Sequence, residues 1–235
     1  MIEVTNLTVR YGGVTSLDTL TVTFDKGICG LIGPNGAGKT TFFNVLSGFV
    51  RPATGTIRAF GDDLLRLTHY RRARWGVRRT FQTEQAISDL TVYDNVAMIS
   101  SPLRGTARRA DVLGAIEFVG AGITPYARVG SLTAGQRRLV EVARAAAGKP
   151  RLILLDEPAA GLPDQETAHL TSVIRQLPGQ TGALTILVDH DMSLVSAVCE
   201  TTTVLDFGKM IASGPTAAVL RDPQVMSAYL GTAEV

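Results

Sequence analysis

The segment GPNGAGKT, residues 33–40, constrains the fold of this chain more than any other part of its sequence. It matches the pattern G-x-x-x-x-G-K-[ST] and stands between an apolar run, ICGLI, and a segment with helical character, TTFFNVLSGF. A strand, a glycine-rich loop and a helix in this order place backbone N–H groups around a phosphate, which the positive end of the helix dipole also attracts. The segment therefore predicts an α/β fold that binds a nucleotide by its phosphates.

Several side chains near this loop have expected tasks. Lys39 should reach the β- and γ-phosphates, and the Thr40 hydroxyl should ligate Mg²⁺. Tyr11, in the segment VRYGG, is a candidate to stack on adenine, although an aromatic residue at a strand end also commonly serves in packing. The residues of this region expected to contact ATP are Tyr11, Gly33, Pro34, Asn35, Gly36, Ala37, Gly38, Lys39, Thr40 and Thr41.

A second apolar run, LILLDEP at residues 152–158, supplies two carboxylates at the end of a predicted buried strand. Open α/β sheets bind their ligands at the carboxyl ends of the strands, and adjacent strand residues point to opposite sides. Asp156 and Glu157 are therefore expected to act differently. Asp156 would hold Mg²⁺ through water, while Glu157 would face the γ-phosphate and polarise the attacking water.

Two further polar side chains follow predicted strands. Gln82 ends the strand-like segment VRRTFQ and is expected to contact the metal and the attacking water. His190 follows the apolar run ALTILVD, where an imidazole can hydrogen-bond the γ-phosphate. The alternative for both is an ordinary structural or solvated polar residue. The predicted catalytic residues are Glu157, His190 and Gln82, and the predicted metal-binding residues are Thr40, Gln82 and Asp156.

The segment LTAGQRR, residues 132–138, begins another helix. Thr133 and Gln136 fit the capping box [ST]-x-x-[EQ], and Ala134 and Gly135 keep the helix start slim enough for a ligand to approach. We expect the Thr133 hydroxyl and the Gly135 N–H to be free for a phosphate. Because the first loop already forms a complete phosphate site, this second helix start predicts that these four residues complete a nucleotide site on another subunit.

Size, charge and hydrophobicity narrow the class of protein. The chain has 235 residues, 45% of them hydrophobic, which suits a domain with a sizeable core. Its net charge of +2 gives little long-range attraction to nucleic acid. No apolar run approaches the roughly 18 residues needed to cross a bilayer, and the N-terminus shows no signal-peptide pattern. Cys29 and Cys199 are interpreted as buried thiols in a reducing compartment.

Secondary-structure signals divide the chain into a core and an insertion. Strands are predicted within residues 1–32 and at TGTIRAFG, and buried parallel strands at RLILLD and ALTILVD. TVLDFGKMIASG is typical of a hairpin, and the tail AAVLRDPQVMSAYLG of a helix. The predicted organisation is an α/β core, residues 1–83 and 151–235, with an inserted helical lobe at residues 84–150.

Taken together, these motifs resemble those of the ATP-binding-cassette ATPases. GPNGAGKT, Gln82, LTAGQ, LILLDEP and His190 stand in that family's order and span nearly the whole chain. The resemblance implies a RecA-like P-loop NTPase core with an N-terminal antiparallel β subdomain and an inserted helical subdomain. It also implies hydrolysis of ATP with Mg²⁺ by two domains paired head to tail. Each ATP then lies between the P-loop of one chain and LTAGQ, the signature segment, of the other.

Finer features resemble one subgroup of that family. DEPAAGL, RRTFQ and DPQVMSAYLG are similar to ATPase subunits of importers for branched-chain and other hydrophobic amino acids, or for urea and amides. This implies a peripheral position at the cytoplasmic face of the inner or plasma membrane, on transmembrane permease subunits, as a homo- or heterodimeric ATPase pair. An extracytoplasmic substrate-binding protein would be an indirect partner.

The chain also departs from the family pattern. Thr133 and Ala134 replace the Ser and Gly of the usual LSGGQ signature. Pro163 stands where the wider family carries Asp, which puts communication between the two ATP sites in question. The segment between TVYDNVAM and LTAGQ is shorter than is typical of the subgroup.

Two other functions share the same ATPase motifs. One is the ATPase subunit of a lipid or lipopolysaccharide exporter, because the tail segment AYLG of this chain also resembles that group. The other is a soluble cassette ATPase that acts on nucleic acid through a basic run. That run consists of Arg71, Arg72, Arg74, Arg78 and Arg79. We interpret it as a solvated helix and strand face and expect no nucleic-acid partner. A stand-alone kinase or GTPase would leave LTAGQ and His190 without a role.

Overall fold

The computed structural model describes residues 1–104 and 108–230, and a six-stranded sheet lies at the centre of these residues. The strand order is β10–β9–β3–β8–β7–β6, parallel except for β10. The strands are β3 (Ile28–Ile32), β6 (Val77–Arg79), β7 (Leu152–Asp156), β8 (Leu184–Val188), β9 (Thr201–Asp206) and β10 (Lys209–Pro215). Every residue of β3, β7 and β8 is buried, as expected for parallel strands covered on both faces.

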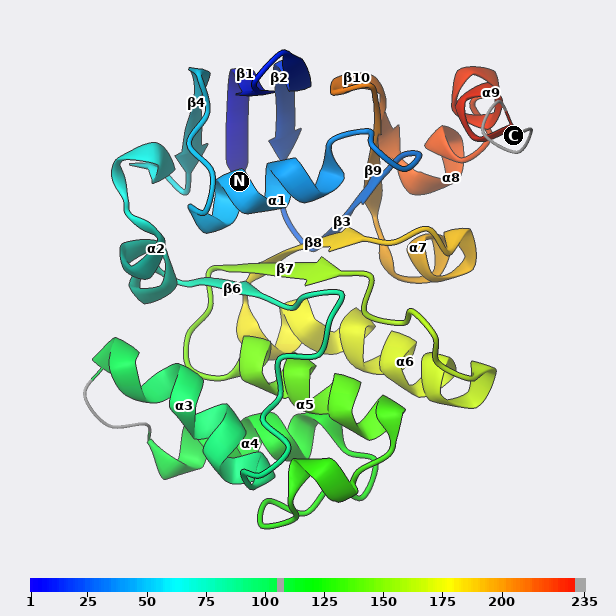
Figure 1. Ribbon diagram of the computed structural model, residues 1–235. Helices are drawn as coiled ribbons and strands as arrows, with labels where there is room; N and C mark the ends of the chain where they lie inside the picture. The colour runs from blue at the N-terminus through cyan, green and yellow to red at the C-terminus, as the bar shows by residue number, and fades with distance from the viewer. Residues whose placement is uncertain (105–107, 231–235) are drawn as a thin grey trace.

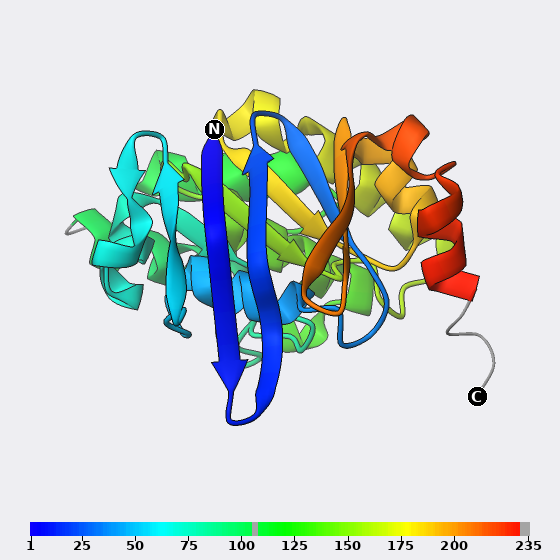
Figure 2. The same cartoon turned by 90° about the horizontal axis from the view of Figure 1, so that it is seen from above.

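A smaller antiparallel sheet has the strand order β2–β1–β4–β5. Its strands are β1 (Ile2–Tyr11), β2 (Val14–Phe24), β4 (Thr54–Ala59) and β5 (Asp62–Asp63). β1 and β2 form a long hairpin whose tip extends beyond the rest of the molecule (Figure 2). These strands confirm the predictions for the N-terminal segment and for TGTIRAFG.

Helices cover both faces of the central sheet. α1 (Lys39–Ser47) lies between the two sheets, whereas α5 (Ala134–Ala146) and α6 (Asp164–Thr181) lie on the opposite face (Figure 1). α3 (Val92–Arg104) and α4 (Arg109–Val119) pack against α5. The other helices are α2 (His69–Trp75), α7 (Met192–Val198), α8 (Thr216–Val219), α9 (Pro223–Leu230) and the 3₁₀ turns Leu64–Arg66 and Val129–Ser131. None of the described helices is long and apolar enough to cross a membrane.

The central sheet has a separate hydrophobic core on each face, because successive strand residues point in opposite directions. In β7, Leu152 and Leu154 pack with α1 and the antiparallel sheet. Ile153 and Leu155 pack with α5 and α6. Both cores hold the parallel strands in register, so the loops that follow β3, β7 and β8 emerge at the same edge.

Most elements lie where the sequence predicts them. β7 and β8 coincide with RLILLD and ALTILVD, β9 and β10 form the predicted hairpin, and α3, α4 and α5 fall in the predicted helical region. α6 and α7 were not predicted, and Pro178 inside α6 weakens the helical pattern of that segment. Gly231 of the predicted tail lies outside the described residues. The division of the chain at residues 84 and 150 stays a prediction.

The basic run before β7 is not the solvated face that its composition predicts. Arg72 and Arg78 are buried, and the Arg79 side chain is only 6% exposed. Arg72 donates to the carbonyl oxygen of Leu46 at the end of α1, at 3.1 Å. A helix end leaves its last carbonyl groups unpaired, and a guanidinium group can satisfy several of them at once. This part of the run therefore stabilises the core and is withdrawn from solvent.

The two cysteines are free and buried, as the sequence predicts. The Thr201 hydroxyl lies 3.4 Å from the Sγ atom of Cys29. Burial raises the pKa of the Cys199 thiol to about 12. A thiol with so high a pKa stays protonated and unreactive at neutral pH, so this cysteine is a packing residue.

Candidate nucleotide-binding site

The glycine-rich loop between β3 and α1 has a backbone shape that glycine permits. Gly33 has φ +150° and Gly38 has φ +104°, values that residues with side chains rarely adopt. A Cβ atom at Gly33 would lie 2.1 Å from the carbonyl oxygen of Leu205. One at Gly38 would lie 2.6 Å from that of Ser16. At Gly36, in contrast, a Cβ atom would meet no described atom within 4 Å. Neighbouring backbone holds both ends of the loop, and its middle is open.

Lys39 is the first residue of α1, and the loop itself holds its ammonium group. The Nζ atom donates to the carbonyl oxygens of Gly33 at 2.6 Å and Pro34 at 2.9 Å. Burial lowers the pKa of Lys39, and the negative charges of Glu157 and Asp156 oppose that shift. A cation fixed at the loop, with two carboxylates nearby, is suited to bind phosphate oxygens.

The two threonines that follow Lys39 have different surroundings. The hydroxyl groups of Thr41 and Ser16 are 2.7 Å apart, and this hydrogen bond ties α1 to β2. Thr40 is exposed, and its hydroxyl has no hydrogen-bond partner among residues 1–104 and 108–230. α1 also begins without a side-chain cap, so the N–H groups of its first turn face the loop.

Asp156 ends β7 as a buried carboxylate paired with Arg79. Its Oδ2 atom lies 2.8 Å from Nη2 of Arg79, with the two side chains 5% and 6% exposed. Arg79 also donates to Oδ1 of Asn44 on α1 at 2.7 Å and lies over the ring of Phe81. Burial raises the pKa of Asp156, and Arg79 opposes that rise. Sequence reasoning missed this partner, because Arg79 stands in a run whose charges resemble those of a surface.

Glu157 follows β7 in a left-handed backbone conformation, with φ +46°. This conformation is uncommon for residues other than glycine and is often found at functional sites. The N–H of Glu157 donates to the carbonyl oxygen of Val188 at 2.8 Å, which fixes the turn at the end of β8. Oε2 of Glu157 lies 3.8 Å from Nδ1 of His190. The structure thus places the adjacent acids in different surroundings, Asp156 at a buried arginine and Glu157 at a histidine.

Tyr11 and His190 are the exposed aromatic side chains among the predicted site residues. Tyr11 is the last residue of β1 and is 48% exposed. The His190 side chain is 69% exposed and follows β8 at the edge where the phosphate loop also lies. Both rings are therefore open to solvent, and the stacking of Tyr11 on adenine stays a prediction.

The oxygen atoms near the loop suit Mg²⁺ that is held together with a nucleotide. The described residues contain no group of three or more His, Cys, Asp or Glu side chains that could hold a metal ion. Mg²⁺ usually takes only one or two protein oxygens, with water and substrate phosphates completing its octahedral shell. The exposed Thr40 hydroxyl and the Asp156 carboxylate are hard oxygen donors of this kind.

Gln82 lies in a loop and not at the end of a strand, contrary to the prediction. β6 ends at Arg79, and among the described strands it pairs only with β7. The Gln82 side chain is exposed, and the backbone carbonyl oxygen of Gln82 accepts a hydrogen bond from Nη2 of Arg138 at 2.8 Å. α5 therefore holds the backbone of this loop and leaves the Gln82 amide in solvent.

The first turn of α5 has the predicted capping box and an occupant that the sequence did not predict. The Gln136 N–H donates to the Thr133 hydroxyl, and the Thr133 N–H donates to Oε1 of Gln136. The Thr133 hydroxyl donates to Oε1 of Glu166 at 2.9 Å, and the Gly135 N–H donates to Oε2 at 3.1 Å. The prediction that both donors are free is wrong here, because α6 packs beside α5 and brings a carboxylate to them.

The arginines of LTAGQRR attach α5 to the loop that carries Gln82. Nε of Arg137 lies 2.9 Å from Oε2 of Glu84 in a half-exposed ion pair. Arg138 donates to the carbonyl oxygens of Phe81 and Gln82. Sequence reasoning missed these contacts, because they join residues more than 50 positions apart.

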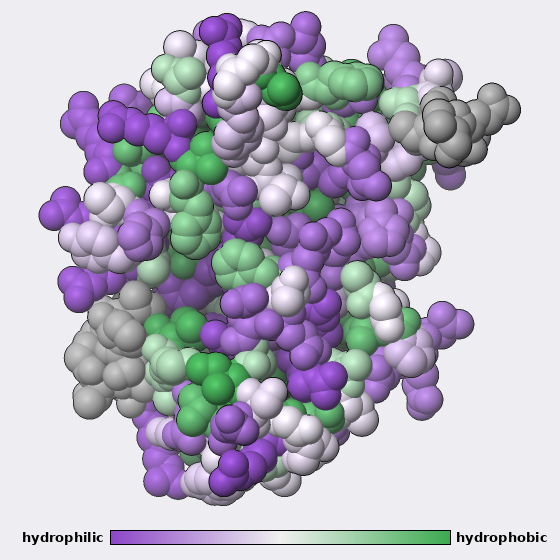
Figure 3. Space-filling model, viewed as in Figure 1, coloured by the Kyte–Doolittle hydropathy of each residue, from purple (hydrophilic) through white to green (hydrophobic). Residues whose placement is uncertain are grey.

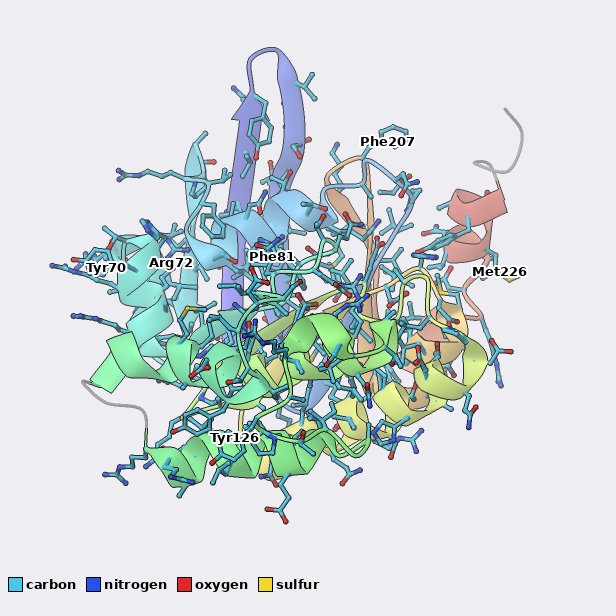
Figure 4. All side chains as sticks on the ribbon, turned by 60° about the horizontal axis from the view of Figure 1, so that its bottom comes forward. Tyr70, Arg72, Phe81, Tyr126, Phe207 and Met226 are labelled. Atoms are coloured by element: carbon cyan, nitrogen blue, oxygen red, sulfur yellow. The ribbon has the colours of Figure 1, made fainter. Side chains whose placement is uncertain are left out.

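A groove of about 550 Å³ lies between α2–β6 and the helices α3 and α5, with Phe81 and the aliphatic Ile99 in its wall. Phe49 and Tyr70, which also line it, are 60% and 49% exposed. Tyr70 projects from α2 in Figure 4, where Phe81 is also labelled. On the face shown in Figure 3, green apolar residues lie among purple polar ones between the upper and lower parts of the molecule. A groove with exposed apolar residues in its wall is typical of a docking face.

Proteins that place this strand–loop–helix in a mostly parallel sheet, beside a strand ending in acids, bind and hydrolyse nucleoside triphosphates. The chain is a P-loop ATPase of that class. Residues 17–160 match the family model for ABC transporters, and residues 209–235 match that for branched-chain amino acid ATP-binding cassette transporters. The chain therefore belongs to the ATP-binding-cassette (ABC) transporter family.

Similar proteins match nearly the whole chain. The high-affinity branched-chain amino acid transport ATP-binding protein BraF of Pseudomonas aeruginosa is 34% identical, over 99% of this chain and 98% of that protein. The corresponding protein LivG of Escherichia coli K12 is 33% identical with the same coverage. The ADP conformation of MJ1267, an ATP-binding cassette of an ABC transporter, has a TM-score of 0.87 at 25% identity and covers 98% of both chains. These matches confirm the predicted α/β P-loop fold.

Proposed function

We propose that this chain hydrolyses ATP to energise a membrane importer for branched-chain or other hydrophobic amino acids. The similarity that supports the importer extends beyond the ATPase motifs. BraF and LivG match 99% of the chain, and residues 209–235, which match the branched-chain model, lie outside the ABC transporter match at residues 17–160. The C-terminal segment therefore carries subgroup information that a shared phosphate loop does not.

In the proposed reaction, a water oxygen attacks the γ-phosphorus of ATP. The bond from that phosphorus to the oxygen that bridges to the β-phosphate breaks, and ADP and phosphate leave. Glu157 orients the water and accepts its proton. Its left-handed backbone, which is uncommon for a residue other than glycine, and its 3.8 Å separation from His190 support this role. His190 hydrogen-bonds the γ-phosphate, and Gln82 contacts the water.

The phosphate loop and its neighbours position the nucleotide in this proposal. Lys39 and the free N–H groups of the first turn of α1 bind the β- and γ-phosphates, and Tyr11 stacks on adenine. Thr40 and Asp156 would hold Mg²⁺, which when bound neutralises phosphate charge as it develops in the reaction. Arg79 pairs with Oδ2 of Asp156, which leaves the other oxygen of this carboxylate for the metal ion.

A second cassette completes each catalytic site. The first turn of α5 has a hydroxyl and an N–H aimed at one anion, and this anion-shaped site lies apart from the chain's own phosphate loop. We infer that Thr133, Ala134, Gly135 and Gln136 contact the γ-phosphate of ATP held by a partner cassette in a head-to-tail pair. The dimeric structure of MJ0796, a bacterial ABC transporter cassette, shares the fold with a TM-score of 0.80 at 21% identity.

The groove beside Phe81 is the proposed docking site for a cytoplasmic helix of a permease subunit. Phe81 lies in the groove wall and against Arg79, which in turn holds Asp156. A helix seated there would therefore contact the same residues that support the nucleotide site. In this proposal the chain lies at the cytoplasmic face of a membrane, with an extracytoplasmic substrate-binding protein as an indirect partner.

The test is to tag the chain, extract it from native membranes in mild detergent and identify the accompanying proteins by mass spectrometry. The expected companions are permease chains and a cassette partner, with a labelled branched-chain amino acid transported in vesicles that contain the complex. Phe81→Ala should weaken recovery of the permease, whereas Tyr126→Ala, an exposed aromatic on the helical lobe, should not. Recovery with lipid-export proteins, or with no membrane protein, would contradict the importer.

A further inference from the structure

Glu166 joins α6 to the first turn of α5 through both oxygens of its carboxylate. One oxygen accepts from the Thr133 hydroxyl at 2.9 Å, and the other accepts from the Gly135 N–H at 3.1 Å. A Cβ atom at Gly135 would lie only 2.5 Å from Cδ of Glu166. The carboxylate therefore fills the space that the missing side chain of Gly135 leaves.

The chemistry of this contact is that of a bound phosphate. A hydroxyl and a helix N-terminal N–H are donors that bind phosphate oxygens, and an ionised carboxylate uses them in the same charge-assisted way. Glu166 also lies in the first turn of its own helix, so the positive ends of α5 and α6 both face it. Two anions cannot share these donors, since each donor has one hydrogen and like charges repel.

We propose that Glu166 makes the pairing of two cassettes specific for ATP over ADP. Its carboxylate occupies the phosphate contacts of the signature segment and is displaced by the γ-phosphate of ATP on the partner cassette. The inference rests on the proposed function, since it takes the signature segment as half of a shared ATP site. ADP has no γ-phosphate to compete with Glu166, so the contact favours separate chains when ADP is bound.

The test measures how much ATP is needed to pair the cassettes. The parent chain carries Glu157→Gln to prevent turnover, and it is studied alone and with any second cassette recovered from membranes. Glu166→Gln keeps the size of the side chain and removes its charge, while Glu166→Ala removes the competing group. Glu117→Gln is the matched control, because Glu117 is exposed on α4 and has no side-chain bond among the described residues. ATP binding by each separate chain shows that it is folded.

Sedimentation at increasing ATP concentration should give dimers of both Glu166 variants at about tenfold less ATP than the parent needs, with the control unchanged. The same ATP midpoint in all four chains would overturn the role of Glu166 and leave the shared ATP site standing. No dimer in any chain at saturating ATP would instead contradict the shared site itself, and the role of Glu166 with it.

Discussion

The chain has two helix starts shaped for phosphate, and they differ in how their donors are satisfied. α1 begins without a side-chain cap, and the loop before it is open around Gly36. α5 begins with a complete capping box, and its Thr133 hydroxyl and Gly135 N–H are both bonded to Glu166. One start is thus open, and the other is filled by a side chain of the same protein.

The proposed pairing of two cassettes accounts for this difference. A loop that binds its own nucleotide can leave its N–H groups to water until the nucleotide arrives. A helix start that binds the nucleotide of another chain has no phosphate to bind in the separate protein. Gly135 is buried, and a buried N–H without a partner costs about 1–3 kcal/mol. The Glu166 carboxylate avoids that cost until the partner is present.

The largest expected effect tests whether ATP is hydrolysed beside the phosphate loop that precedes α1. Glu157→Gln should lower the ATPase rate about 1,000-fold, because an amide cannot accept the proton of the attacking water. Nucleotide affinity should change little, since the phosphate loop is intact. Phosphate release under saturating ATP measures the rate, with Glu117→Gln as the control. A normal rate in Glu157→Gln would assign the proton to another group.

The next effect tests nucleotide binding at α1. Lys39→Ala should weaken ATP binding about 100-fold, because the loop loses the cation that its Gly33 and Pro34 carbonyl groups hold in place. Titration with a fluorescent ATP analogue measures this affinity in the separate chain. Lys149→Ala removes an exposed lysine of equal charge and should bind normally. Equal affinity in both variants would show that the phosphates bind elsewhere.

Gly135→Asp tests the helix start of α5, and its effect should appear only when two cassettes pair. The added carboxylate meets Glu166 and repels an incoming phosphate, so ATPase activity should fall at least about tenfold. ATP binding to the separate chain should stay normal, because the P-loop is untouched. Loss of binding in the separate chain would show that the two starts are not independent sites, or that the variant is misfolded, which circular dichroism would reveal.

The smallest effect compares the two starts directly. Thr133→Val removes the N-cap of α5 and should lower the free energy of unfolding by about 1 kcal/mol, or a few degrees in Tm. Thr40→Val, at a start without a side-chain cap, should change it by less than about 0.5 kcal/mol. Calorimetry without nucleotide measures both. Equal losses would remove the distinction between a capped and an uncapped start.

Features that depend on consecutive residues could be predicted from the sequence. The phosphate loop, the buried strands and the Thr133–Gln136 capping box were all predicted and found, because each depends on the order and periodicity of neighbouring residues. Lys39 and Glu157 could be assigned tasks for the same reason, since each stands at a fixed step from the end of a strand.

Contacts between residues far apart in the sequence could not be predicted, because they depend on tertiary packing. Arg79 and Asp156 are 77 positions apart, and they pair because β6 lies beside β7. Thr133 and Glu166 are 33 positions apart, and they meet because α5 packs on α6. No local pattern records which strands or helices become neighbours. The sequence therefore predicts the two helix starts that suit a phosphate. The packing of α6 on α5 explains why Glu166 occupies one of them.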